Sequence, residues 1–124
     1  DIVQIGIRAS TPEQLEFADE NGIDIITIDD IQDIEFNDII SDNMYLSFDL
    51  DVLDPAFAPG VGNPEPGGLS TREVIQIIKS LKCDIIGFDI VEFAPRYDIG
   101  KKTSFVAAKI IKETLGKIAE SKKS

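Results

Sequence analysis

The stretch YLSFDLDVLDPAFAPGVGNPEPGGLSTRE, residues 45–73, joins an apolar strand pattern to closely spaced aspartates and a long loop rich in proline and glycine. The apolar residues predict a buried strand over residues 44–50, with Asp49 and Asp51 two positions apart at its end. Residues two apart on a strand point to the same side, so these two carboxylates are expected to converge on one point. Carboxylates held that close repel each other unless a cation or a shared proton lies between them.

Two interpretations of this pair are open from the spacing alone. Carboxylate oxygens are hard ligands that favour Mg²⁺, Ca²⁺ or Mn²⁺, so the pair can form part of a metal site. Alternatively, one carboxylate caps a loop amide and the other faces solvent. A calcium-binding EF-hand loop is excluded, because Leu53 and Asp54 would occupy its fifth and sixth positions and a strand precedes it. A phosphatase of the haloacid-dehalogenase type, which also ends a strand in Asp-x-Asp, remains a rival.

The rest of the chain alternates predicted strands with predicted helices. Further strands are expected over residues 2–7, 23–28 and 84–93. Helices are expected over about 12–21, 71–81 and 103–120, and residues 30–41 carry a weaker helical pattern. Capping boxes mark two helix starts, Thr11 with Gln14 and Ser70 with Glu73, and Gly22 is expected to end the first helix. The apolar stripes of the last two helices are expected to be Val74, Ile77, Ile78 and Leu81, then Val106, Ile110, Ile111, Leu115 and Ile118.

This alternation predicts an α/β fold, a three-layer αβα arrangement with a mainly parallel sheet covered on both faces. Ligands of such sheets bind outside the carboxyl ends of the strands. Asp49 and Asp51 fall at one such end, and Glu92 falls at the end of the next predicted strand. The sequence therefore predicts a functional site formed by these three carboxylates.

The charge and composition narrow the class of protein. The chain of 124 residues has 12 basic and 23 acidic residues and a net charge of −11. This charge argues against nucleic acid or an anionic membrane as a partner and is compatible with a cationic ligand. The single cysteine, Cys83, rules out an internal disulfide, and no signal segment is apparent, so we expect a cytoplasmic protein. The absence of histidine and the start at Asp1, directly in a strand, lead us to expect part of a longer chain.

Residues 47–73, SFDLDVLDPAFAPGVGNPEPGGLSTRE, closely resemble the third metal-binding signature of the ureohydrolases, the family of arginases and agmatinases. The resemblance continues in QIGIRA (residues 4–9), GFDIVEFAPRYD (87–98) and TSFVAAKII (103–111). It implies an arginase-like fold, in which residues 1–124 form the C-terminal part of a single ureohydrolase domain that is normally more than twice as long.

The resemblance also implies roles for individual residues. Asp49 and Asp51 are expected to bind a binuclear manganese (Mn²⁺) centre, and Glu92 is expected to contact the guanidinium group of the substrate. Asp54 is expected to cap the loop. Without the resemblance, a salt bridge from Glu92 to Arg72 or Arg96 is the alternative. The family's two histidines and two further aspartates are missing, so the metal site is incomplete and no catalytic residue is expected in this portion.

The reaction implied by the resemblance is metal-dependent hydrolysis of a guanidino C–N bond. PEPGG at residues 64–68, together with Val52, is more similar to agmatinases than to arginases. The implied reaction is therefore agmatine plus water to putrescine plus urea, within polyamine biosynthesis, in an enzyme that forms trimers or hexamers. Asn63, where relatives mostly have threonine, leaves the substrate open. The alternatives are another ureohydrolase (a guanidinobutyrase, an arginase or a formimidoylglutamase) and a non-catalytic half-domain that binds a partner. This portion by itself is expected to be inactive.

Overall fold

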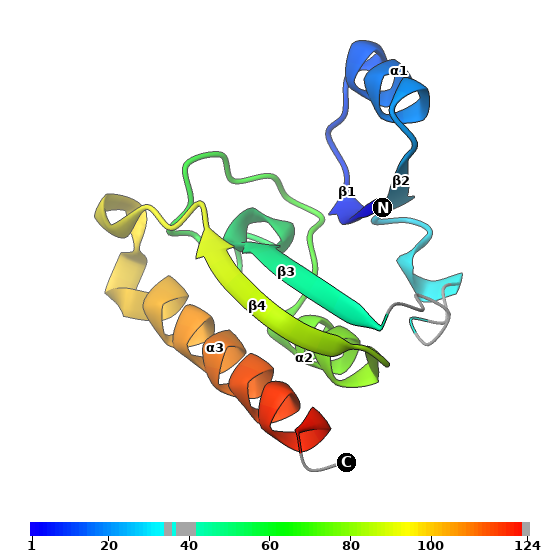
Figure 1. Ribbon diagram of the computed structural model, residues 1–124. Helices are drawn as coiled ribbons and strands as arrows, with labels where there is room; N and C mark the ends of the chain where they lie inside the picture. The colour runs from blue at the N-terminus through cyan, green and yellow to red at the C-terminus, as the bar shows by residue number, and fades with distance from the viewer. Residues whose placement is uncertain (34–35, 37–41, 123–124) are drawn as a thin grey trace. The chain divides into compact units, whose positions relative to one another are not determined.

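A computed structural model of the protein describes residues 1–33, 36 and 42–122 (Figure 1). The chain divides into two compact units, Asp1–Ile34 and Glu35–Ser124. The described strands form two two-stranded parallel sheets, one in each unit. The predicted α/β fold with parallel strands is confirmed, and the assignment of all 124 residues to one domain stays a prediction. No helix in the described part of the chain combines the length and the apolar character needed to cross a bilayer.

The first unit is a strand–helix–strand motif. It contains β1 (Ile2–Ile7), α1 (Pro12–Glu20), β2 (Ile23–Thr27) and the short 3-10 helix η1 (Ile31–Asp33). The Thr11 hydroxyl accepts the backbone N–H of Gln14, and the Gln14 side chain accepts that of Thr11, so the predicted capping box is confirmed. Gly22 follows the helix with a φ of 63°, a left-handed conformation that glycine adopts without strain. Apart from η1, the weak helical pattern over residues 30–41 falls largely outside the described residues.

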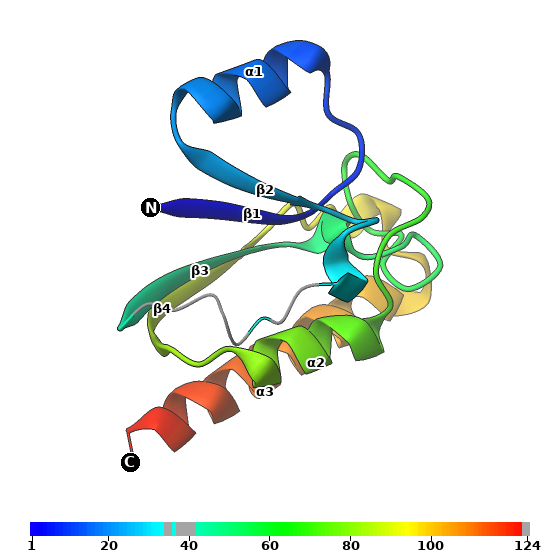
Figure 2. The same ribbon diagram turned by 90° about the vertical axis from the view of Figure 1, so that its right-hand side faces the viewer.

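The second unit carries the Asp-rich stretch. Its elements are β3 (Asn43–Asp49), η3 (Leu50–Val52), α2 (Thr71–Ser80), β4 (Asp84–Val91), η4 (Pro95–Tyr97), η5 (Ile99–Lys101) and α3 (Lys102–Ser121). The two strands are parallel neighbours, and α2 and α3 both lie on one face of their sheet (Figure 2). The second predicted capping box is also present, because the Ser70 and Glu73 side chains each accept the other residue's backbone N–H.

The core of the second unit lies between this sheet and the two helices. Burying one large aliphatic side chain contributes about 1.5–3 kcal/mol, so the core is the main source of stability of the unit. On α2, Ile75 is buried where the pattern predicted Ile77, which is only partly buried. The buried apolar residues of the second unit include Phe48, Leu50, Leu53, Ala58, Val61, Leu69, Val74, Ile75, Ile78, Leu81, Ile85 and Ile110.

The predicted apolar stripe of α3 is partly wrong. Ile111 and Leu115 are 38% and 52% exposed, whereas Thr103 and Thr114 are fully buried. Residues 103, 110 and 114 share one side of a helix of 3.6 residues per turn, and residues 111 and 115 lie beside that side. The Thr114 hydroxyl donates to the Ile110 carbonyl oxygen at 2.9 Å, which satisfies the polar group inside the core. A helical threonine can therefore take a buried position that a hydrophobic pattern assigns to isoleucine or leucine.

Candidate functional site

The expectation that Asp49 and Asp51 lie on one strand is wrong. β3 ends at Asp49, and Asp51 lies in η3. The Asp49 Oδ1 atom accepts the backbone N–H of Asp51 at 2.9 Å, which caps this short helix and turns the chain out of the strand. Leu50 and Leu53, on either side of Asp51, are 0% and 1% exposed and anchor the turn in the core. The amide-capping interpretation is thus correct for Asp49, and the metal-binding role of both aspartates stays a prediction.

The capping bond leaves Asp49 able to bind a cation. A carboxylate has two oxygens with about four acceptor positions, and the bond to Asp51 occupies one of them. Among the described residues, no group of three or more histidine, cysteine or acidic side chains is gathered as a metal site. Asp49 and Asp51 carry hard carboxylate oxygens of the kind that suits Mn²⁺, and their role as metal ligands stays a prediction.

Asp54 stabilises the loop rich in proline and glycine between η3 and α2, residues 53–70, called here the Pro/Gly loop. One carboxylate oxygen accepts the backbone N–H of Ala56 at 2.8 Å. The other accepts the backbone N–H groups of Gly67 and Gly68, at 2.8 and 3.2 Å. The predicted capping role of Asp54 is confirmed, and its side chain joins the beginning of the loop to its end.

Backbone contacts join the end of this loop to the turn that carries Asp51. The Leu69 N–H donates to the Val52 carbonyl oxygen, and the Asp54 N–H donates to the Leu69 carbonyl oxygen, both at 2.9 Å. Gly68 lies against the backbone of residues 52–54 at this point of contact. A Cβ atom at Gly68 would lie 2.5 Å from the Asp54 nitrogen and 2.7 Å from the Val52 oxygen, so only glycine fits there. The loop therefore supports the position of Asp51.

Glu92 follows β4 in an unusual backbone conformation. Its φ is 64°, and a left-handed conformation costs a residue other than glycine about 1–2 kcal/mol. Strained residues of this kind gather at functional sites. In the sheet register Asp49 is opposite Val91, so Glu92 comes directly after the partner of Asp49. The structure thus brings Asp49 and Glu92 to the same end of the β3–β4 sheet, as predicted.

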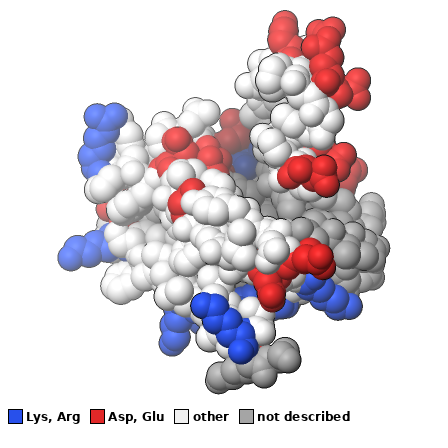
Figure 3. Space-filling view, viewed as in Figure 1, with Lys and Arg blue, Asp and Glu red and all other residues white. Residues whose placement is uncertain are grey.

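The alternative partners predicted for Glu92 are not its partners. Within the described residues, Glu92 forms no ion pair with Arg72 or Arg96. The Glu92 side chain points toward the Pro/Gly loop, because a Cβ atom at Gly62 would lie 3.5 Å from Glu92 Oε2. Figure 3 shows acidic side chains gathered beside the carboxyl ends of β3 and β4, whereas basic side chains lie along α3 and at the margins. This end of the sheet suits a cationic group.

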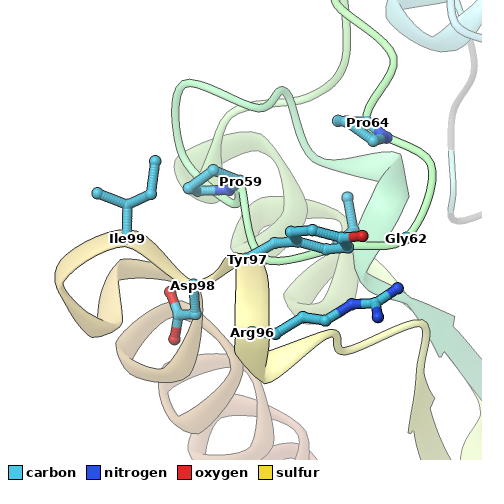
Figure 4. A pocket seen from close by; sticks show the side chains of 8 residues that line it. Pro59, Gly62, Pro64, Arg96, Tyr97, Asp98 and Ile99 are labelled. Atoms are coloured by element: carbon cyan, nitrogen blue, oxygen red, sulfur yellow. The ribbon is translucent and has the colours of Figure 1, made fainter.

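A pocket lies beside Glu92 that the sequence analysis missed. Its volume is about 490 Å³, and Gly62 belongs to its lining (Figure 4). The walls come from two segments far apart in the sequence, the Pro/Gly loop and the residues of η4 and η5. The lining residues are Pro59, Val61, Gly62, Pro64, Arg96, Tyr97, Asp98 and Ile99.

Asp98 holds one wall of this pocket to α3. Its carboxylate accepts the Thr103 N–H at 2.7 Å, the Ser104 N–H at 3.0 Å and the Ser104 hydroxyl at 2.6 Å. Burial, the largest single influence, raises the pKa of Asp98, but the hydrogen bonds from Ser104 and Thr103 together hold that pKa below its usual value. Asp98 lies five residues before Thr103, farther than an ordinary N-cap, so a sequence search for capping residues does not find it.

The other wall is attached to the same helix. The Gly60 N–H donates to the buried Thr103 hydroxyl oxygen at 2.7 Å, and the Gly60 carbonyl oxygen accepts the Ala94 N–H at 2.8 Å. A Cβ atom at Gly60 would lie 2.9 Å from both Asp98 Cβ and Thr103 Oγ1. Glycine is therefore needed for the close approach that forms the pocket.

The chain is similar in sequence and fold to known proteins. The chain is 39% identical over 130 residues to the guanidinopropionase of Pseudomonas aeruginosa, covering 96% of this chain and 41% of that protein. Its structure resembles the proclavaminate amidino hydrolase of Streptomyces clavuligerus, with a TM-score of 0.84, 39% identity, and coverage of 94% of this chain and 42% of that one. It also resembles the agmatine ureohydrolase of Thermoplasma volcanium, with a TM-score of 0.84, 38% identity, and coverage of 98% and 43%.

The chain spans about two fifths of the length of these relatives. The solved structures share its parallel strands and helices, so the arginase-like fold is confirmed. The sequence model of the arginase family matches residues 1–116, which is nearly the whole chain. This match covers the acidic turn after β3 and the glutamate after β4. The chain therefore belongs to the arginase family, the ureohydrolases.

Proposed function

We propose that this chain forms part of a ureohydrolase that hydrolyses a guanidino C–N bond and releases urea and an amine. The observation that carries the proposal is the register of β3 and β4, which brings Asp49 and Glu92 to one end of the sheet. Membership of the arginase family supports a hydrolase and removes the phosphatase alternative. Relatives named guanidinopropionase and agmatine ureohydrolase support guanidino chemistry.

In the proposed reaction Glu92 binds the substrate. A planar guanidinium donates parallel N–H bonds to a carboxylate, and Glu92 has no competing ion pair with Arg72 or Arg96. The left-handed backbone conformation of Glu92 fixes the direction in which its side chain points from the end of β4. Glu92 thereby orients the guanidinium carbon toward the end of β3, where Asp49 and Asp51 lie.

Asp49 and Asp51 would hold manganese, together with ligands from outside the described residues. Manganese, when bound, makes hydroxide available as a nucleophile at neutral pH and polarises the bond to be cleaved. The bond from Asp49 to the Asp51 amide holds one carboxylate still, and the buried leucines hold the other in place. Because these residues supply only part of a metal site, we propose that the 124-residue chain alone is inactive.

Agmatine is the substrate that residues 64–68 favour, and its hydrolysis to putrescine and urea is the first reaction to test. A guanidino acid is the other candidate, and Arg96 in the pocket beside Glu92 favours it over agmatine. We further propose a cytoplasmic homo-oligomer, a trimer or a hexamer, that acts on a small guanidino compound through its cationic guanidinium group and binds neither nucleic acid nor membrane.

The test is urea release by a chain extended to the length of the relatives, supplied with Mn²⁺ and a set of guanidino substrates. Glu92→Gln should keep the metal and lower kcat/KM by roughly 10²-fold or more, since a desolvated charge pair is worth a few kcal/mol. Glu16→Gln, the same change on the exposed face of α1, is the matched control and should leave kcat/KM unchanged. Absence of urea from every guanidino substrate would contradict the proposed function.

A further inference from the structure

Arg96 is a cationic side chain with uncommitted donors in the pocket. Its Cζ atom lies 4.6 Å from the centroid of the Tyr97 ring, so the guanidinium stacks on the ring. Arg96 is exposed and forms no ion pair with another described residue. Stacking holds the plane of a guanidinium and leaves the N–H groups at its edges available to an oxygen acceptor.

The other charged residue of the lining does not neutralise Arg96. The Asp98 carboxylate is occupied by its three hydrogen bonds from Thr103 and Ser104. Figure 4 shows the Arg96 side chain extending away from Asp98. The pocket thus presents a positive group that no described residue pairs with, in a protein whose net charge is −11.

The remaining walls of the pocket are mainly apolar. Pro59, Pro64, the Tyr97 ring and Ile99 surround the space (Figure 4). Its volume of about 490 Å³ is in the range of small-molecule sites. A bidentate contact with arginine is the usual way in which proteins recognise a carboxylate or phosphate. The fitting ligand has a short apolar body and an acidic end.

Gly62 connects this pocket to Glu92. It lines the pocket, and a Cβ atom at this position would lie 3.5 Å from Glu92 Oε2. Glu92 Oε2 thus lies close to one edge of the pocket, and a linear molecule held at Glu92 can extend past Gly62 toward Arg96. Such a molecule carries a guanidinium at one end, for Glu92, and an acidic group at the other, for Arg96.

We propose that Arg96 is a specificity-determining residue that binds the acidic tail of a linear guanidino acid, and that guanidino acids are preferred to agmatine. Agmatine ends in an ammonium group, which the like charge of Arg96 disfavours at the same position. This inference rests on the proposed hydrolysis of guanidino compounds and names the substrate class of that site.

The experiment compares 4-guanidinobutanoate with agmatine, two linear guanidino compounds with opposite charges at the far end. The enzyme is a chain extended to the length of the relatives and loaded with Mn²⁺. The wild type should have the higher kcat/KM for the acid. Arg96→Ala should lower kcat/KM for the acid about 10- to 100-fold, mainly through KM, and should leave agmatine unchanged or improved. Arg96→Lys keeps the positive charge but lacks the paired N–H donors of a guanidinium, so it should lower kcat/KM for the acid by an intermediate amount.

Arg72→Ala, a change at an exposed arginine of α2 outside the pocket, is the matched control and should affect neither substrate. Equal losses for both substrates in Arg96→Ala, or a wild-type preference for agmatine, would overturn the role of Arg96 while the proposed hydrolysis stands. Absence of urea from both compounds and from every other guanidino substrate would overturn the proposed function, and the substrate role of Arg96 with it.

Discussion

Gly68 is the position at which a single methyl group should damage the candidate site most. A Cβ atom there would lie 2.5 Å from the Asp54 nitrogen, 2.7 Å from the Leu53 carbonyl carbon and 2.7 Å from the Val52 oxygen. All three are backbone atoms, so no flexible side chain can move aside. Gly68→Ala therefore has to push the end of the Pro/Gly loop away from the turn that carries Asp51.

The size of the effect follows from these contacts. Ordinary contact begins at 3.4 Å, so the backbones must separate by 0.7–0.9 Å, the difference between 3.4 Å and the distances of 2.7 and 2.5 Å. That shift stretches the two 2.9 Å bonds between Leu69 and the turn beyond ordinary hydrogen-bond length. Losing two such bonds costs about 1–3 kcal/mol, and overpacking costs about 1–3 kcal/mol. Because part of the strain relaxes when the bonds break, we expect a total of about 2–4 kcal/mol.

The assay is urea unfolding of the 124-residue chain followed by tyrosine fluorescence. The chain has no tryptophan, and both of its tyrosines, Tyr45 and Tyr97, belong to the second unit. The signal therefore reports the unit that contains Gly68. The matched control is Gly116→Ala in α3, where nothing lies within 4 Å of the new methyl group. Replacing a helical glycine by alanine should stabilise the unit by about 0.5–1 kcal/mol.

The two substitutions add the same methyl group and should change the free energy of unfolding in opposite directions. A loss below about 1 kcal/mol for Gly68→Ala would refute the steric argument, because the loop could then move without breaking its bonds. A loss in Gly116→Ala as large as that in Gly68→Ala would show that added methyl groups destabilise this unit regardless of contact.

Three further predictions concern single carboxyl and phenol groups. The pKa of Asp98 is low in the folded state because, although burial raises it, the hydrogen bonds from Ser104 and Thr103 outweigh burial. The stability that it contributes is therefore present above the unfolded pKa of about 3.9 and is lost as the pH falls through the lower folded value. The difference in unfolding free energy between the wild type and Asp98→Asn should shrink over that acidic range; a constant difference would contradict this cause. Asp51→Ala in a chain of the relatives' length should lower bound manganese, measured by metal analysis, and unchanged content would exclude Asp51 as a ligand. The hydrogen bond from the Tyr45 hydroxyl to Asp89, helped by burial and by the nearby negative charge, raises the pKa of Tyr45. Ultraviolet titration should show this pKa falling in Asp89→Asn.

The sequence by itself determined the local elements of this protein. The capping boxes at Thr11 and Ser70 depend on residues three positions apart, so their geometry is set before any tertiary contact forms. Apart from the weak helical pattern over residues 30–41, the predicted strands and helices correspond to those of the structure within about two residues, because period and capping are short-range signals. The arginase-family membership was also accessible, since the motif at residues 47–73 is continuous in the sequence.

Tertiary structure decided what lies between elements. Asp51 lies in η3 and not in line with the strand, because the Asp49 side chain accepts its backbone N–H and two buried leucines hold the turn. The sequence predicted that Asp49 and Glu92 lie at carboxyl ends of strands, but the register that sets Asp49 opposite Val91 pairs strands about forty residues apart, and no local pattern specifies it. The Arg96 pocket exists because Gly60 and Asp98 are both hydrogen-bonded to the start of α3, through Thr103. These contacts join segments distant in the sequence, and only packing of the whole unit selects them.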